Sequence, residues 1–144
     1  YLQGYLKTSK KKKNNKKLKP LEFLSSNGFK ILVGRNNIQN DELTLKKSSK
    51  NDMWFHTKEI PGSHTVILTE GKKIPEETLL QAATIAAFHS KAKESSNVPV
   101  DYTEIRNVHK PNGSKPGMVI YDKYNTIYVT PDKELIKKLK VEFE

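Results

Sequence analysis

One stretch of the sequence, residues 75 to 95, has the spacing of a long helix, while the segments around it are shorter. Pro75 suits the first turn of a helix, and the two glutamates after it complement the positive end of the helix dipole. Leu79, Ala83 and Ala86 then share one stripe. Because alanine side chains are small, this helix can lie close against a sheet. The fold is therefore constrained to pack its remaining segments around one helix.

The segments before this helix have the apolar runs and turn residues that are typical of strands. Asn27-Gly28 is a strong hairpin signal, and we predict that the second strand of this hairpin covers residues 29 to 33. The asparagine-rich residues 35 to 41 favour turns or a helix cap. Aromatic and β-branched residues predict two further strands, at residues 53 to 57 and 65 to 69.

The segments after the helix follow the same pattern. We predict a strand at residues 100 to 108, a loop at 110 to 117, and a hairpin between residues 118 to 121 and 126 to 130. A final helix starts at Pro131-Asp132 and has an apolar side. This order of elements predicts an α+β fold, with a mainly antiparallel sheet packed by one long helix and a C-terminal helix.

Positive charge is concentrated at one end of the chain. The net charge is +10, but residues 1 to 20 contain eight lysines and no acidic residue. Residues 21 to 144 contain 18 basic and 16 acidic residues and are nearly balanced. We therefore predict the end of a helix or a lysine-rich linker at 1 to 20, serving as a flexible tether or a nucleic-acid arm, and a folded domain at 21 to 144. Any anion site on the folded domain has to be local.

The composition excludes several classes of protein. The chain has no cysteine, which excludes a disulfide scaffold, a cysteine zinc site and a cysteine nucleophile. No apolar run approaches the roughly 20 residues that a membrane span needs, so we predict no membrane partner and a cytoplasmic location. Because the chain begins with Tyr1 rather than Met, we expect it to be part of a longer protein.

Residues 52 to 64, DMWFHTKEIPGSH, hold the densest group of reactive side chains. A zinc site needs three or four converging ligands, and no third ligand is evident beside His56 and His64. Ser63 and His64 are adjacent, so their side chains point apart and do not form a catalytic pair. His89, near the end of the long helix, is better explained as a capping or surface histidine than as a ligand. We predict no metal site, no cofactor and no catalytic residue.

The glycine turns of this sequence fit phosphate binding better than metal binding or catalysis. Residues 34 to 37 and 61 to 64 form two turns whose backbone N–H groups can hold an anion, and the loop at 110 to 117 adds lysines. Trp54 offers a flat face for an unpaired base. Each feature also has a structural explanation, since Trp54 suits a core, Arg35 suits a solvated or paired position, and the asparagines suit turns.

Four sequence blocks in this order resemble the NFACT-R domain of the NFACT family. They are VGRNNIQND, DMWFHTKEIPGSH, QAATIAAFHSKAKESSNVPVDYT and HKPNGSKPGMV, and the resemblance covers about residues 20 to 140. Residues 1 to 20 resemble the end of the coiled coil that precedes this domain in the family. The resemblance implies an RNA-binding module in a ribosome-associated quality-control factor that supports C-terminal alanine tailing of nascent chains. The implied partners are tRNA, the rRNA of the large ribosomal subunit and the rest of a longer chain of its own. The resemblance implies no catalysis by this part.

The resemblance and the turn chemistry together nominate a set of candidate RNA-binding residues. These are Arg35, Asn36, Asn37, Asn40, Asp52, Trp54, His56, Lys58, Gly62, Ser63, His64, Lys110 and Lys115. We predict that a strand, a tight turn and a second strand present His56, Ser63 and His64 beside Arg35 as one polar face. Two other functions remain open: a fibronectin-binding adhesin, as an older name of bacterial family members suggests, and a protein-docking domain without RNA contact.

Overall fold

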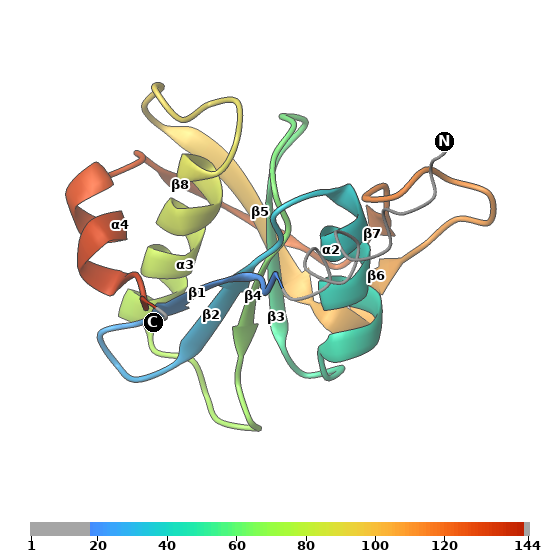
Figure 1. Ribbon diagram of the computed structural model, residues 1–144, viewed down its shortest axis with the longest axis horizontal. Coiled ribbons are helices and arrows are strands. Elements are labelled where there is room, and N and C mark those ends of the chain that lie inside the picture. Colours follow the sequence, from blue (N-terminus) through green and yellow to red (C-terminus); the bar gives the residue numbers. More distant parts are fainter. Residues whose placement is uncertain (1–17, 143–144) are drawn as a thin grey trace, which may run out of the picture.

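The computed structural model describes residues 18–142, which are built around one six-stranded sheet (Figure 1). The order of its strands is β1-β2-β4-β3-β5-β8, and all neighbouring strands are antiparallel. The six strands are β1 (Leu21–Leu24), β2 (Lys30–Val33), β3 (Met53–Thr57), β4 (Thr65–Leu68), β5 (Val98–Glu104) and β8 (Asn125–Val129). The predicted α+β class with a mainly antiparallel sheet is confirmed.

Different elements cover the two faces of the sheet. On one side lie the long helix α3 (Glu76–Phe88) and the C-terminal helix α4 (Lys133–Leu139) (Figure 1). The other side holds the short helix α2 (Asn37–Asp41), the π-helical turn η2 (Glu42–Lys47), the 3-10 turn η3 (Ile105–Asn107) and a two-stranded ribbon. This ribbon pairs β6 (Val108–His109) with β7 (Ile120–Tyr121). Both faces of the sheet are therefore covered by other elements.

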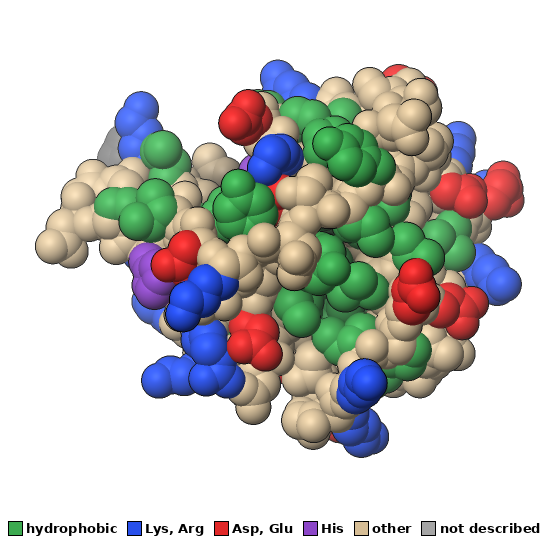
Figure 2. Space-filling view, turned by 180° about the vertical axis from the view of Figure 1, so that it is seen from behind, with side chains coloured by type: hydrophobic (Ala, Val, Ile, Leu, Met, Phe, Trp, Pro, Cys, Tyr) green, Lys and Arg blue, Asp and Glu red, His purple; other side chains and the backbone are tan. Residues whose placement is uncertain are grey.

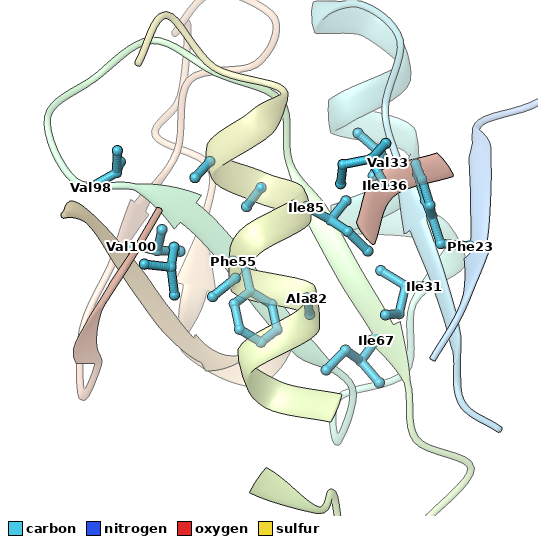
Figure 3. Close-up of a cluster of buried hydrophobic side chains, with 14 of the residues drawn as sticks. Phe23, Ile31, Val33, Phe55, Ile67, Ala82, Ile85, Val98, Val100 and Ile136 are labelled. Atoms are coloured by element: carbon cyan, nitrogen blue, oxygen red, sulfur yellow. The ribbon is translucent and has the colours of Figure 1, made fainter. Parts of the chain in front are cut away.

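The main core lies between the sheet and α3 (Figure 3). Every second residue of a strand points to the same face of the sheet. Ile31 in β2, Phe55 in β3 and Val100 in β5 all point to the face that α3 covers. The alanines of α3 face them, and Ala82, Ala83, Ala86 and Ala87 are buried, so the helix lies close to the sheet as predicted.

A second, smaller core lies on the opposite face. Its buried members are Leu43, Trp54, Val66, Ile105 and Val108. Trp54 and Phe55 are neighbours in β3, and both are fully buried, because the two faces of the sheet are both covered. This second core is the reason that several polar residues of the DMWFHTKEIPGSH block are buried, as shown below.

Most predicted elements occur where expected. β1 and β2 form the hairpin at Asn27-Gly28, where Gly28 has a φ of +90° that favours glycine. β3 has the predicted bounds, and β4 ends one residue early. Residues 35 to 41 contain the predicted helix cap, because the Asn36 side chain accepts a hydrogen bond from the backbone N–H of Gln39. Asp132 caps α4 in the same way.

The predicted length of the long helix was wrong. It ends at Phe88 rather than near residue 95. Beyond it, the backbone of residues 89 to 91 pairs with the β3–β4 loop, where Ser63 N–H donates to the His89 carbonyl and Lys91 N–H donates to that of Pro61. These bonds between segments take the place of another helical turn.

The predicted hairpin between residues 118 to 121 and 126 to 130 was also wrong. β7 pairs with β6, and β8 pairs with β5. The Tyr121 ring packs against Trp54 on one side of the sheet, while Val129 belongs to the main core on the other. The predicted strand at 100 to 108 is divided as well, because η3 separates β5 from β6.

Two predictions concern the ends of the chain and the membrane. The lysine-rich segment of residues 1 to 20 lies almost wholly outside the described residues, so its boundary with the domain stays a prediction. Within residues 18–142, no helix is long and apolar enough to cross a membrane.

Candidate nucleic-acid interface

A surface groove lies where three segments meet, and we call it the basic groove. The segments are the start of α2, the β3–β4 loop and the end of α3 with the residues after it. Its volume is about 490 Å³. Its lining residues are Arg35, Asn36, Asn37, Asn40, Pro61, Gly62, Ser63, Phe88, His89, Ser90, Lys91 and Lys93. The groove thus joins two of the predicted phosphate-binding turns, those at 34 to 37 and 61 to 64.

The first wall is held by the capping of α2. Asn36 uses its side chain for the cap, and Arg35 N–H donates to the Gln39 side chain at 2.6 Å. Asn40 is buried, and its amide oxygen accepts a bond from the backbone N–H of His64 at 3.1 Å. A Cβ atom at Gly34 would overlap with this oxygen, which explains the glycine. Arg35 and Asn37 remain exposed.

The second wall is the β3–β4 loop, which approaches the third wall closely. Gly62 forms an isolated β-bridge with Ser90. A Cβ atom at Gly62 would lie 2.8 Å from the Cβ of Ser90, so the two backbones approach this closely only with glycine here. Gly62 therefore has a structural role, while the partly exposed Ser63 lines the groove.

The third wall was missing from the predicted site. Lys91 and Lys93 follow α3, are exposed and line the groove. The lysine pair in HSKAK was the signal for it, but the predicted helix to residue 95 concealed its position. His89 has the expected capping role, since its Nδ1 and backbone N–H both donate to the Ile85 carbonyl, at 2.8 and 3.1 Å.

The charge of the basic groove has one sign. Arg35, Lys91 and Lys93 line it, and none of the lining residues is acidic. Since residues 21 to 144 are nearly balanced in charge, this concentration is local. Three cations that line one polar groove can attract an anion or the backbone of a nucleic acid.

Trp54, His56, His64 and Tyr121 form a separate group, the aromatic–histidine cluster, on the smaller-core side of the sheet. The Trp54 ring stacks on His56 at 5.8 Å between centroids and meets His64 edge-on at 5.3 Å and Tyr121 at 4.7 Å. Because β3 and β4 pair, the two histidines lie 5.7 Å apart, as expected for paired strands. Trp54 is fully buried, which confirms its structural explanation as a core residue.

His64 is also buried, with 1% of its surface exposed. Its Nε2 donates to the Gly117 carbonyl at 3.1 Å, so its Nδ1 is left to accept the Thr44 hydroxyl at 2.8 Å. This is the neutral form of the ring. Burial lowers the pKa of His64 to about 4, and repulsion from His56 adds to this effect. Its side chain holds the 110–117 loop and does not face the basic groove.

Three more predicted residues are on this side of the sheet or beside it. Asp52 is buried and accepts hydrogen bonds from the backbone N–H groups of Ser49 and Thr69, at 2.8 and 2.9 Å. His56 is partly buried, and burial lowers its pKa. The Lys58 ammonium lies 3.4 Å from Asp101 and 4.6 Å from the centre of the Tyr124 ring. These residues are not brought together with Arg35.

The late loop, residues 110 to 117, packs against α2. The Lys110 ammonium forms a salt bridge with Asp41 at 3.2 Å and donates to the carbonyls of Lys115 and Met118. Asp41 also accepts the Gly117 N–H at 2.9 Å. Lys110 therefore closes the loop, whereas the Lys115 side chain is exposed. The loop lies near the groove, since a Cβ at Gly117 would meet Asn37 at 2.8 Å.

Metal-ligating side chains do not converge in the part of the chain described. Residues 18–142 contain no group of three or more histidine, cysteine, aspartate or glutamate side chains that could hold a metal ion. The two histidines of the aromatic–histidine cluster are satisfied by Thr44, Thr57 and Gly117 instead.

Comparison with known proteins identifies the family. Residues 19–123 match the family described as "NFACT protein RNA binding domain". The chain belongs to this NFACT-R family. The matched residues include all three walls of the groove and the late loop. All four sequence blocks that suggested the resemblance therefore lie within the match.

Individual relatives agree with this assignment. The Rqc2 homolog RqcH of Bacillus subtilis (strain 168) is 51% identical over 144 residues, covering 96% of this chain and 25% of the relative. A Drosophila melanogaster protein named ribosome quality control complex subunit NEMF homolog is 32% identical over 82 residues, covering 56% of this chain and 8% of that protein. The chain thus spans about a quarter of the bacterial relative.

A solved structure has the same fold. The C-terminal part of the fibronectin/fibrinogen-binding protein from Streptococcus suis superposes with a TM-score of 0.85 and 47% sequence identity. The match covers 96% of this chain and 55% of that chain. The NFACT-R fold described above is therefore shared with a close structural relative.

Proposed function

We propose that this chain is the RNA-contacting part of a ribosome quality-control factor, and that the basic groove is its main contact with RNA. The partners in this proposal are tRNA and the rRNA of the large ribosomal subunit, in the cytoplasm, with a contribution to C-terminal alanine tailing. This part provides binding and has no catalytic role. The family's description as an RNA-binding domain and the name of the Drosophila relative support the proposal.

The observation behind the proposal is the charge of the groove. Arg35, Lys91 and Lys93 come from two different walls and line one surface without an acidic residue. The Arg35 guanidinium can hold a phosphate with two parallel N–H bonds, while each lysine acts as a point charge. Ser63 and Asn37 add polar groups that suit a phosphate or a ribose hydroxyl.

The proposed contact set is therefore narrower than the predicted one. It consists of Arg35, Asn37, Ser63, Lys91 and Lys93, with Lys115 as an outlying cation on the late loop. Asp52, Trp54 and His64 are buried, so they are not in the proposed contact set. Contact of His56, Lys58 or Lys110 with RNA remains a prediction outside this set.

The test is tRNA binding over a series of salt concentrations, with the double variant Arg35→Ala/Lys91→Ala. Each phosphate contact contributes a slope of about −0.7 to −0.9 in a plot of log affinity against log salt. We expect the variant to bind more weakly and the slope to fall in magnitude by up to about 1.4 to 1.8, because two phosphate contacts are removed. The matched control is Lys46→Ala/Lys47→Ala, which removes two exposed charges from η2.

Three outcomes would count against the groove. Equal losses in the groove variant and the control would make the affinity a general charge effect. Binding by residues 1–144 that disappears in residues 21–144 would assign it to the lysine-rich segment. Crosslinks from the groove to ribosomal protein alone, with none to RNA, would favour a docking domain.

A second candidate is binding to fibronectin, favoured by the name of the Streptococcus suis protein with the same fold. Fibronectin binding that survives moderate salt and is unaffected by the Arg35→Ala/Lys91→Ala variant would support a separate adhesive surface. Binding that vanishes as salt rises would indicate nonspecific attraction to lysines.

A further inference from the structure

We infer that the basic groove takes unpaired nucleotides of RNA, with one base stacked on the ring of Phe88, and that the strand continues past this ring towards α4. The inference rests on the proposed function of the groove and adds the class of RNA that the groove takes. It is carried by the position of Phe88, by the lysine that stands over its ring, and by a second hollow beside the groove.

The Phe88 ring is held in place and has one face at the surface. Phe88 is partly buried and packs against the main core, and the His89 ring meets it edge-on at 5.2 Å between centroids. The Lys93 ammonium lies 4.5 Å from the centre of the Phe88 ring. Because Lys93 is exposed, the ring face beneath its ammonium is at the surface. An aromatic ring that is fixed by the core and reaches the surface is a platform for a base.

A base can take the place of the Lys93 ammonium on this ring. A cation over an exposed aromatic ring changes an equilibrium constant by about 2- to 5-fold, whereas a base stacked on an aromatic side chain changes it by about 5- to 150-fold. The stacked base is therefore favoured. Lys93 also lines the groove, so its displaced ammonium can pair with a phosphate of the same strand.

A second hollow, of about 220 Å³, adjoins the basic groove. It lies between the residues after α3 and the start of α4, the helix beside α3 in Figure 1. Phe88 and Lys93 line both hollows, so the ring and its lysine stand where the two meet. Lys133 adds a cation, and Glu94 is the one acidic residue among the described residues that line the second hollow. The two hollows thus form one path, with cations before and after an aromatic ring.

These features favour unpaired nucleotides over a duplex. The bases of a duplex are stacked on one another, so they leave the Phe88 ring without a partner, whereas an unpaired base offers a free face. On the face of the domain seen in Figure 2, acidic side chains lie among the lysines and arginines. The basic groove has no acidic lining residue, so it attracts a chain of phosphates more strongly than a surface of mixed charge does.

The first test compares two ligands with the same number of phosphates, using residues 1–144. One is an oligouridylate of about eight nucleotides, and the other is an abasic ribose–phosphate oligomer of the same length, which has no base to stack. We expect Phe88→Leu to lower the affinity for the oligouridylate by at least about fivefold and to leave the affinity for the abasic oligomer unchanged. The matched control is Phe88→Tyr, which keeps an aromatic ring and should bind the oligouridylate as the unmodified chain does.

The unmodified chain gives a result even if Phe88→Leu does not fold. It should bind the oligouridylate at least about fivefold more tightly than the abasic oligomer, because stacking is lost with the bases. Equal affinities of the unmodified chain for the two oligomers would overturn the inference. An acidic peptide of the same charge that binds as tightly as the oligouridylate would also overturn it, and would assign the path to a protein partner.

The continuation of the path towards α4 has its own test. Lys133→Ala should reduce the magnitude of the salt slope for the oligouridylate by about 0.7, which is the contribution of one phosphate contact on a single strand. The matched control is Lys138→Ala, which removes an exposed lysine of the same helix that lines neither hollow. Equal slopes for the two variants would end the path at Phe88 and overturn this part of the inference.

The same measurements separate this inference from the proposed function. If Arg35→Ala/Lys91→Ala weakens the binding of both oligomers while folded Phe88→Leu changes neither, the groove binds phosphates without a stacked base. The inference then fails and the proposed function stands. If Arg35→Ala/Lys91→Ala changes the binding of neither oligomer, the proposed function itself fails, and the inference fails with it.

Discussion

The basic groove and the aromatic–histidine cluster are built from the same sequence blocks but do different work. Ser63 lines the groove, while His64, the next residue, is 1% exposed and bonded to Thr44 and Gly117 on the other side. Neighbouring residues of an extended chain, such as these two just before β4, point to opposite sides. Within one short polar motif, some residues can therefore form a contact surface while others hold the fold. A high number of polar residues in a motif does not show which residue has which role.

Trp54→Ala is expected to have the largest effect on stability. Trp54 is fully buried among His56, His64 and Tyr121, and its loss leaves a cavity under the late loop. We expect the free energy of unfolding to fall by about 3–5 kcal/mol. Urea unfolding measures this change. A loss below about 1 kcal/mol would mean that the cluster is not a core.

The second largest effect on stability is expected from acid, which should lower the free energy of unfolding through His64. The pKa of His64 falls from 6.5 to about 4 on folding, so the unfolded chain binds the proton more readily between these values. Stability from this group is complete above pH 6.5 and is lost as the pH falls towards 4. We expect a loss of about 2 kcal/mol between pH 7 and pH 5.

The control for this pH dependence is His64→Gln, whose side chain does not titrate. Its urea unfolding should be weaker at pH 7 and less dependent on pH than that of the unmodified chain. The remaining dependence would belong to groups such as His56 and His89, whose pKa values are also lowered by burial. Identical pH profiles for the two chains would contradict the buried neutral state of His64.

Gly62→Ala should lower both the stability of the domain and its RNA affinity, because the added Cβ would push the β3–β4 loop away from the segment after α3. The new Cβ would meet Ser90 at 2.8 Å and the Thr57 hydroxyl at 3.0 Å. We expect a loss of about 1 kcal/mol or more in unfolding free energy, together with weaker RNA binding. Ser63→Ala in the same loop is the control, and its stability should change by less than about 0.5 kcal/mol. Similar stability for both variants would contradict the close approach at Gly62.

The smallest effect on stability is expected in the groove itself. Arg35 and Lys91 are exposed, so Arg35→Ala/Lys91→Ala should change the unfolding free energy by less than about 0.5 kcal/mol for each substitution. RNA affinity should nevertheless fall. Comparison of urea unfolding with tRNA binding for the same protein separates contact from support. A variant that loses both equally would show that the groove is also structural.

Much of the fold follows from local sequence. Asn27-Gly28, the β-branched runs and the amphipathic helix each specify their element through short-range conformational preference, and each occurs near its predicted place. The failures were also local in origin. Tyr121 suits a strand in either pairing, and only its packing on Trp54 and its bond to Asp101 assign β7 to β6.

By itself, the sequence determined the α+β class, most strands, the helix caps and the loops that meet at the groove, because these depend on residues close together in the chain. Only the tertiary structure decided which polar residues are exposed. Trp54, His64 and Asp52 are buried because a second layer covers their face of the sheet. Lys91 and Lys93 line the groove because α3 ends at Phe88. The residues after it are hydrogen-bonded to the β3–β4 loop, through the pairs Ser63–His89 and Pro61–Lys91, which are 26 and 30 positions apart in the chain.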